Sequence, residues 1–212
     1  MNVLEPLTPQ RRRQLTRSHL LAAAEQVFKT RGFHAASIDA VAASAGFTKG
    51  AVYSNFTDKA DLFIALTEHR WNEQFDAVRR ALTDAASLDA DERADLFKRL
   101  VTDLLWGDRD WQLLLLEFSI HAARHPEARQ LLQQRHRVDR ATLAQLIGAE
   151  LDRVGAEAPV PLDDLAGVFL ALFNGIALKH ATHPDSRDEA ILQAAITFLN
   201  YALDGFPRRI ES

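Results

Sequence analysis

Near residue 50 the chain carries polar side chains whose types and spacing suit contact with another molecule. If the segment that follows Thr48 is helical, Val52 and Phe56 point inward and the polar side chains share the outward face. An ammonium group, a phenol, a hydroxyl and an amide can hydrogen-bond to phosphates and to base edges in a DNA groove. The outward set, which helps build no core, is Lys49, Tyr53, Ser54 and Asn55.

A second set of side chains has the spacing of metal ligands. Glu117, His121 and His125 follow one another at intervals of four residues and would share one face of a helix. The same spacing fits a polar stripe, in which His125 is favoured by the dipole at the C-terminal end of the helix. The sequence does not decide between these interpretations, and we expect no bound metal and no other cofactor.

Two short helices joined by a tight turn would position the polar set. Ser37 can cap a helix over residues 38–45, and Gly46 is expected where that helix ends in a left-handed conformation. Thr48 can cap the second helix. Such a pair is a helix-turn-helix, whose second helix enters the DNA major groove. The geometry alone also fits a helical hairpin that never contacts DNA.

The segment from Thr30 to Leu62 resembles the DNA-binding domain of the TetR family of transcriptional regulators. The resemblance covers about residues 14–65 at the level of motifs, and beyond them only length and helical pattern agree. Family members often have bulkier or ring-bearing side chains where this chain has Ser54 and Asn55. The residues that carry the resemblance are Thr30-Arg31-Gly32-Phe33, Ser37-Ile38, Ala45-Gly46, Lys49-Gly50, Tyr53, Phe56, Lys59 and Leu62.

The resemblance implies a division of labour in DNA binding. Base edges would be contacted from the second helix, and phosphates from the first helix and the cap positions. Lys59, at a predicted helix N-terminus, would bind a phosphate there. The expected DNA-binding residues are Arg13, Arg17, Ser37, Thr48, Lys49, Gly50, Tyr53, Ser54, Asn55 and Lys59.

The charge distribution supports nucleic-acid contact through one end of the chain. The net charge is −4, but residues 1–60 hold eight Lys/Arg against four Asp/Glu, and residues 61–212 hold 17 against 25. Arg11, Arg12 and Arg13 begin the first predicted helix after a proline-containing arm. They fit either a solvated first turn or an arm that lies along the minor groove.

The helical periodicity predicts an all-α fold with two domains. Residues 1–60 would form a three-helix DNA-binding head, and residues 61–212 a larger ligand-binding and dimerisation body. A long helix over residues 58–84 would join the two. Further helices are predicted over residues 91–106, 110–125, 127–154, 163–182 and 187–203.

The helix over residues 163–182 is apolar nearly all round, which predicts burial on all sides. Core packing on one side and a second copy of the chain on the other would achieve this, although both faces could instead belong to the core. Dimers of the resembled family form such a four-helix bundle, and a dimer also suits two DNA half-sites. The expected interface residues are Leu165, Ala171, Leu172, Gly175, Ile191, Ala195, Phe198 and Leu199.

The resemblance also implies a small-molecule cavity in the body, although aromatic side chains on helices more often belong to the core. The residues expected to line the cavity are Trp106, Trp111, Phe118, His121, Phe169, Phe173 and Asn174.

Several function classes lack support in the sequence. The chain has no cysteine, which excludes disulfides and thiol chemistry, and it shows no nucleophile–base pair or phosphate-binding loop. We therefore expect no enzyme. No apolar run approaches membrane-spanning length, so a cytoplasmic location is expected. The sequence predicts a homodimeric repressor that binds operator DNA and is released by a small molecule; the alternative is a helical ligand-binding or scaffold protein without specific DNA binding.

Overall fold

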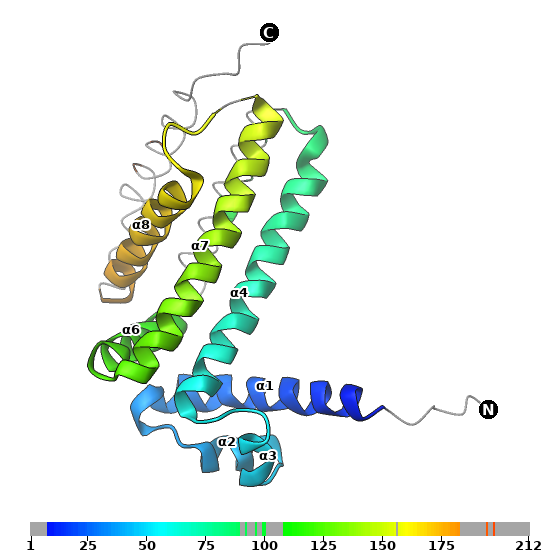
Figure 1. The fold of residues 1–212 in the computed structure, drawn as a ribbon, viewed down its shortest axis with the longest axis vertical. Coiled ribbons are helices and arrows are strands. Elements are labelled where there is room, and N and C mark those ends of the chain that lie inside the picture. Colours follow the sequence, from blue (N-terminus) through cyan, green and yellow to red (C-terminus); the bar gives the residue numbers. More distant parts are fainter. Residues whose placement is uncertain are drawn as a thin grey trace, which may run out of the picture. The chain divides into compact units, whose positions relative to one another are not determined.

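The computed structural model of the protein describes residues 8–89, 92, 96, 99–100, 108–155, 157–182, 194 and 197. Across these residues the fold is all-α without a strand, as predicted, and the ribbon is shown in Figure 1. The predicted helices over residues 91–106 and 187–203 lie largely outside this part of the chain. The helices are α1 (Pro9–Ala35), α2 (Ile38–Ala45), α3 (Lys49–Tyr53), α4 (Lys59–Asp84), the short 3-10 helix η1 (Ala85–Ser87), α6 (Arg109–Arg124), α7 (Pro126–Val154) and α8 (Leu162–Thr182).

The chain divides into two compact units. The head unit comprises Met1–Arg70 and Glu117–Leu132, and the body unit comprises Trp71–Leu116 and Gln133–Ser212. The helices α4, α6 and α7 each contribute residues to both units. The head unit thus extends beyond residue 60 and takes in the C-terminal part of α6. The domain boundary expected at residue 60 stays a prediction.

An aromatic cluster forms the core of the head unit. Phe28, Phe33, Phe63 and Phe118 are all at most 1% exposed. The rings of Phe33 and Phe63 meet edge to face at 5.3 Å between centroids, and Phe63 stacks with Phe118 at 4.6 Å. Because Phe118 comes from α6, this helix completes the core beneath the helix-turn-helix.

The α-helical run of α1 breaks at Gly32, as the sequence predicted. Gly32 has φ 73° and ψ 167°, a conformation that only glycine adopts readily. Phe33 follows and packs on Phe28 of the preceding turn, with ring centroids 5.9 Å apart. The amide N–H of Phe33 donates to Oε2 of Glu117 at 2.7 Å. A Cβ atom built on Gly32 would lie 2.9 Å from the same carboxylate, so an alanine there would displace the end of the Glu117 side chain.

In the body unit, α7 and α8 pack through a small apolar cluster. Leu151 is buried against Ile147, Leu162 and Leu165. A salt bridge of 2.9 Å between Arg140 and Asp163 also joins these two helices. In the part of the chain that the structure describes, no helix combines the length and apolarity needed to cross a membrane.

Candidate nucleic-acid interface

Helices α2 and α3 form the predicted helix-turn-helix, and the capping expected from the sequence is confirmed. Ser37 Oγ accepts from the N–H of Ala40 at 3.2 Å, and Thr48 Oγ1 accepts from the N–H of Ala51 at the same distance. Gly46 has φ 71° and ψ 26°, the left-handed conformation that ends α2. Ser37, Thr48 and Gly46 therefore fix the start of each helix and the turn between them.

The outward face of α3 exposes two of the predicted DNA-binding residues. Tyr53 is 50% exposed, and the side chain of Lys49 is 53% exposed. Val52 and Phe56 are buried on the opposite side, as predicted. Gly50, between the two exposed side chains, adds no side chain that would keep a ligand from the backbone. This face can therefore approach a DNA groove closely.

The ammonium of Lys49 already has an acidic partner. Its Nζ donates to Oδ2 of Asp39 in α2 at 2.9 Å, an interaction the sequence analysis missed. The hydrogen bond to Asp39, its negative charge and, more weakly, Tyr53 raise the pKa of Lys49. A lysine and an aspartate ten positions apart give no helical spacing, so only the turn geometry brings them together.

Ser54 and Asn55 hydrogen-bond locally. Ser54 Oγ and Asn55 Nδ2 each donate to the carbonyl of Ala51 at 2.9 Å. Both groups therefore satisfy a backbone acceptor at the C-terminal end of α3. The base contacts expected from these two residues stay a prediction.

Arg13 and Arg17 of α1 also stabilise the end of α3. Arg13 Nη2 donates to the carbonyl of Ser54 at 3.3 Å, and Arg17 Nη1 donates to that of Asn55 at 3.2 Å. The guanidinium of Arg17 lies over the Phe56 ring, 4.5 Å from its centroid. The helix α3 is only five residues long. Two cations at its C-terminal end stabilise it, because they interact favourably with the negative end of the helix dipole. Whether the same arginines contact phosphate stays a prediction.

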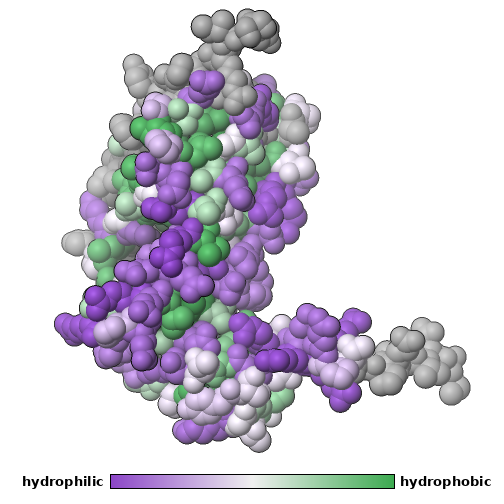
Figure 2. All heavy atoms as spheres, viewed as in Figure 1, coloured by the Kyte–Doolittle hydropathy of each residue, from purple (hydrophilic) through white to green (hydrophobic). Residues whose placement is uncertain are grey.

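The first turns of α1 carry the remaining basic charge of the arm. Arg11, Arg12 and Arg13 are exposed, and hydrophilic side chains predominate on this part of α1 in Figure 2. Thr8 accepts from the N–H of Arg11 and caps the helix. The arginines are thus held on a helix that starts at Pro9.

Lys59 differs from the expectation of a phosphate-binding lysine. Its Nζ donates to the carbonyls of Phe33, His34 and Ala36 at 2.8, 3.1 and 3.0 Å. An ammonium has three donors, so these three bonds use all of them. Nζ also lies 4.7 Å from the centroid of the Phe33 ring, and burial lowers the pKa of Lys59. In this structure Lys59 ties the segment after Gly32 to the start of α4.

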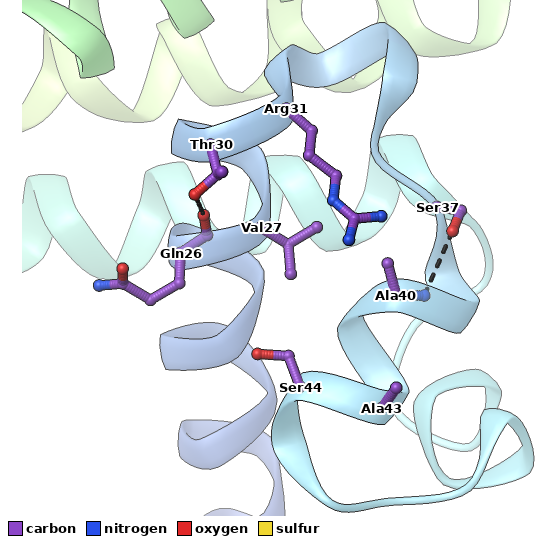
Figure 3. A pocket seen from close by; sticks show the side chains of 8 residues that line it. All are labelled: Gln26, Val27, Thr30, Arg31, Ser37, Ala40, Ala43 and Ser44. Atoms are coloured by element: carbon purple, nitrogen blue, oxygen red, sulfur yellow. Dashed lines mark hydrogen bonds between the residues drawn. The ribbon is translucent and has the colours of Figure 1, made fainter.

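An open groove lies between the end of α1 and α2, with a volume of about 560 Å³. Figure 3 shows the Arg31 side chain extending from α1 toward α2, close to the cap formed by Ser37. Arg31 adds a cation to the head surface that the predicted set did not include. The lining residues are Gln26, Val27, Thr30, Arg31, Ser37, Ala40, Ala43 and Ser44.

The side chains with metal-ligand spacing on α6 have other contacts. Glu117 binds the backbone of Phe33, and the His121 ring lies 4.9 Å from the Phe33 ring. His125 Nδ1 lies 2.8 Å from the carbonyl of His121. Among the described residues, no group of three or more His, Asp or Glu side chains is placed to hold a metal ion. The contacts favour the polar-stripe interpretation.

Two residues expected to line a ligand cavity instead belong to the head unit. Phe118 is 1% exposed within the aromatic cluster, and His121 packs on Phe33. Trp111 is buried in the body unit. On α8, Phe169 and Phe173 are half-buried and Asn174 is exposed. Trp106 lies outside the described residues.

The residues predicted for the dimer interface differ in exposure, and some lie outside the described part of the chain. Ala171, Leu172 and Gly175 are exposed on α8, where Leu172 is 36% exposed. Leu165 is half-buried and packs on Leu151 within the chain, and its expected place in the interface stays a prediction. The remaining predicted interface residues lie outside the described part of the chain and are Ile191, Ala195, Phe198 and Leu199.

Curated relatives match either a short part of this chain or most of it. The chain is 39% identical over 66 residues to the transcriptional activator FasR of Mycolicibacterium smegmatis, covering 31% of this chain and 30% of FasR. It is 48% identical over 48 residues to the transcriptional repressor BepR of Brucella suis, covering 23% of each. The matched region is thus less than a third of either relative's length. With the uncharacterised regulator YfiR of Bacillus subtilis, identity is 25% over 178 residues, or 82% of this chain and 83% of YfiR.

Solved structures with the same fold cover nearly the whole chain. A regulator described as TetR-family from Mesorhizobium loti has a TM-score of 0.70 at 20% identity and covers 92% of this chain and 98% of its own. GusR of Salmonella enterica has a TM-score of 0.65 at 21% identity, with 96% and 100% covered. At these identities the likeness concerns the fold.

The fold and the outward face of α3 define an all-α helix-turn-helix protein. The family model for bacterial regulatory proteins of the tetR family matches residues 20–66, and the model for the tetracyclin repressor-like C-terminal domain matches residues 88–200. The chain belongs to the TetR family of transcriptional regulators.

Proposed function

We propose that this chain is a homodimeric transcriptional repressor that binds a palindromic operator and is released by a small molecule. The observation that carries the proposal is the capped helix-turn-helix whose second helix exposes Lys49 and Tyr53. In this motif the second helix enters the major groove. Lys49 is then the residue that contacts base edges, with Gly50 allowing close approach.

Phosphate contacts come from groups around α3. Ser37 and Thr48 present hydroxyls at helix N-termini, where backbone N–H groups also favour an anion. Tyr53 adds a phenol on the exposed face, and Arg11 and Arg12 extend the basic surface along α1. The ammonium of Lys59 is left out of this set because its donors are occupied by backbone carbonyls.

Dimerisation is proposed through α8. Val168, Leu172 and Leu178 are 61%, 36% and 42% exposed, and open space surrounds Gly175. Apolar side chains at this helical spacing favour a second helix against them. Two heads related by a two-fold axis would contact half-sites about one DNA turn apart.

The proposed ligand acts through helices that belong to both units. Because α4, α6 and α7 run from one unit into the other, a ligand in the body unit can bias the arrangement of the head. The half-buried rings of Phe169 and Phe173 and the buried Trp111 supply apolar surface for such a ligand. By linkage, the ligand binds DNA-free protein more tightly by the factor by which it weakens operator binding, typically about 5- to 150-fold.

The named relatives include an activator and a repressor, so a reporter assay must decide the direction of regulation. A promoter that carries the operator should be less active when this chain is expressed, and higher activity would contradict the repressor role.

DNA binding itself is tested by fluorescence anisotropy with DNA from around the protein's own gene and a scrambled duplex of equal composition. The wild-type protein should prefer its own DNA and lose affinity as salt rises. Tyr53→Ala should weaken binding to both duplexes alike. Tyr53→Phe removes only the hydroxyl and shows how much of the effect comes from the hydroxyl and how much from the ring. Equal wild-type affinity for both duplexes would contradict specific binding and favour the alternative of a ligand-binding protein.

A further inference from the structure

The ion pair between Lys49 and Asp39 lies on the face that the proposed function directs toward DNA. Lys49 is the first residue of α3, and Asp39 lies in the first turn of α2. Their side chains are 53% and 64% exposed, so the pair is open to solvent and to any ligand of α3. An exposed pair of this kind contributes little to stability. Its effect on DNA binding can be larger, because the Asp39 carboxylate both competes for the ammonium and repels a phosphate that approaches it.

Two other acidic side chains of the head unit, those of Asp58 and Glu25, serve the fold. Asp58 Oδ1 accepts from the N–H of Asp61 at 2.8 Å and caps α4. Glu25 pairs with Lys29 at 3.0 Å and also with Arg70. Asp39, in contrast, pairs with a residue that is expected to contact DNA.

We propose that Asp39 is a specificity-determining residue that holds Lys49 away from phosphate on non-specific DNA. This inference rests on the proposed function. On non-specific DNA a free lysine gains affinity by replacing counterions on a phosphate. When the lysine is paired with Asp39, this ion pair must break before the ammonium can contact a phosphate, so the affinity gained from that contact is smaller.

At the correct site the exchange is different. Lys49 can donate to O6 and N7 of a guanine, an acceptor pattern that non-specific phosphate contacts do not offer. The carboxylate of Asp39, once released, can accept from a cytosine amino group, whereas beside a phosphate it is repelled. Asp39 therefore penalises the wrong partner more than the right one, which is how specificity is increased at modest cost in affinity.

The test compares wild type, Asp39→Asn, Lys49→Met and the double variant on two duplexes. One duplex carries the sequence that wild type enriches most from a random pool, and the other is its scrambled form. Removing the carboxylate frees one cation, so Asp39→Asn should bind the scrambled duplex about eightfold more tightly at 0.1 M salt and steepen the salt slope by about one. The enriched duplex should gain less, so the ratio between the two falls.

The double variant shows whether Lys49 mediates the effect. In the Lys49→Met background, Asp39→Asn should change the affinity for the scrambled duplex by less than about twofold, because no ammonium is left to release. Asp39→Glu keeps the negative charge and should retain the wild-type preference for the enriched duplex over the scrambled one. Glu68→Gln removes an exposed carboxylate of α4 in the same unit and controls for net charge.

A measurement without DNA checks the ion pair itself. The pKa of Lys49, followed by NMR at its side chain, should fall toward its ordinary value in Asp39→Asn. If Asp39→Asn tightens binding to both duplexes equally, or has the same effect in the Lys49→Met background, the inference about Asp39 is wrong while the proposed function stands. A wild-type protein that enriches no sequence would overturn the proposed function and this inference with it.

Discussion

At the level of single residues, the ammonium group of Lys59 binds three backbone carbonyls at the C-terminal end of α1 and at the residue that follows it. Charge-assisted hydrogen bonds of this kind stabilise a fold more than neutral ones do. The geometry assigns Lys59 to the architecture of the head unit.

We therefore expect Lys59→Met to destabilise the protein in the absence of DNA. Losing the charged partner of these carbonyls should cost about 1–3 kcal/mol of unfolding free energy. Denaturant unfolding measures it, with Arg79→Met as a control, because the exposed ion pair of Arg79 with Asp76 should contribute at most about 1 kcal/mol. Unchanged stability combined with a DNA salt slope lower by about one would instead support the phosphate contact expected from the sequence.

His121 predicts a pH dependence of stability. Burial lowers its pKa most, followed by the charges of His125, His34 and Lys59, while Asp58 acts in the opposite direction. The unfolded chain then takes up a proton at higher pH than the folded protein does. The contribution of His121 is complete above pH 6.5, the ordinary value, and is lost as the pH falls below it.

Denaturant midpoints measured on both sides of pH 6.5 check this expectation. The wild type should lose stability on the acidic side, and His121→Gln should lose less. Burial also lowers the pKa of His136 in the body unit. The variant His136→Gln therefore measures how much of the pH dependence of stability comes from this second histidine. A His121→Gln protein with the full wild-type pH dependence would contradict the assignment.

The sequence predicted local residue roles well and distant ones poorly. Ser37, Thr48 and Gly46 act within a few residues of their own positions, so local rules identify them. The contacts of Lys59 and Asp39 depend on how the turns fold, which spacing does not reveal. The hydroxyl and amide of Ser54 and Asn55 found local acceptors for the same reason that such residues favour helix ends.

At the level of elements, the junction between α1 and α2 depends on Gly32 and Glu117. The carboxylate from α6 accepts the N–H of Phe33 and fills the space beside Gly32. The sequence predicts a helix end at Gly32, but for Glu117 it predicts only a metal ligand or a place in a polar stripe. Its partner is a backbone amide 84 positions away, a contact that no local pattern contains.

Gly32→Ala should destabilise the head unit more than Gly46→Ala does. Both glycines have positive φ, but ψ 167° at Gly32 belongs to a region that is essentially limited to glycine, and the new Cβ would meet Glu117. We expect a cost of about 1–3 kcal/mol for the backbone conformation at Gly32. Nothing lies within 4 Å of the Cβ position at Gly46, so there only the left-handed conformation is strained.

Thermal or denaturant unfolding of both variants measures the difference. Glu117→Ala in the Gly32→Ala background should recover only the steric part, because the backbone strain remains. Equal stability of the two glycine variants would show that Glu117 and the φ/ψ values at Gly32 do not constrain the junction.

At the level of the whole molecule, α8 carries the apolar surface proposed to bind a second copy. A charge at Val168 would be buried without a partner in such an interface and would cost several kcal/mol of association free energy. Val168→Asp or Ala171→Glu should therefore give monomers by light scattering, with operator binding lost although the head is unchanged. Val138→Asp, which replaces another exposed apolar residue of the body unit, should leave a dimer. A DNA-binding dimer in both α8 variants would place the interface elsewhere.

The all-α class and the helix positions could be predicted because hydrophobic periodicity is local to each helix. The roles of Phe118 and His121 could not. Aromatic residues on a helix face fit a ligand cavity and a core equally well, and only the packing of the C-terminal part of α6 within the head unit resolves the choice.

Two copies of α3, one from each protomer, are proposed to bind a specific DNA sequence. Enrichment of bound duplexes from a random pool, followed by sequencing, tests this proposal most directly. The wild type should enrich a palindrome whose half-sites lie about one helical turn apart, and Lys49→Ala should change the preferred bases within each half-site. A pool that stays random, or a preferred sequence that Lys49→Ala leaves unaltered, would contradict the account.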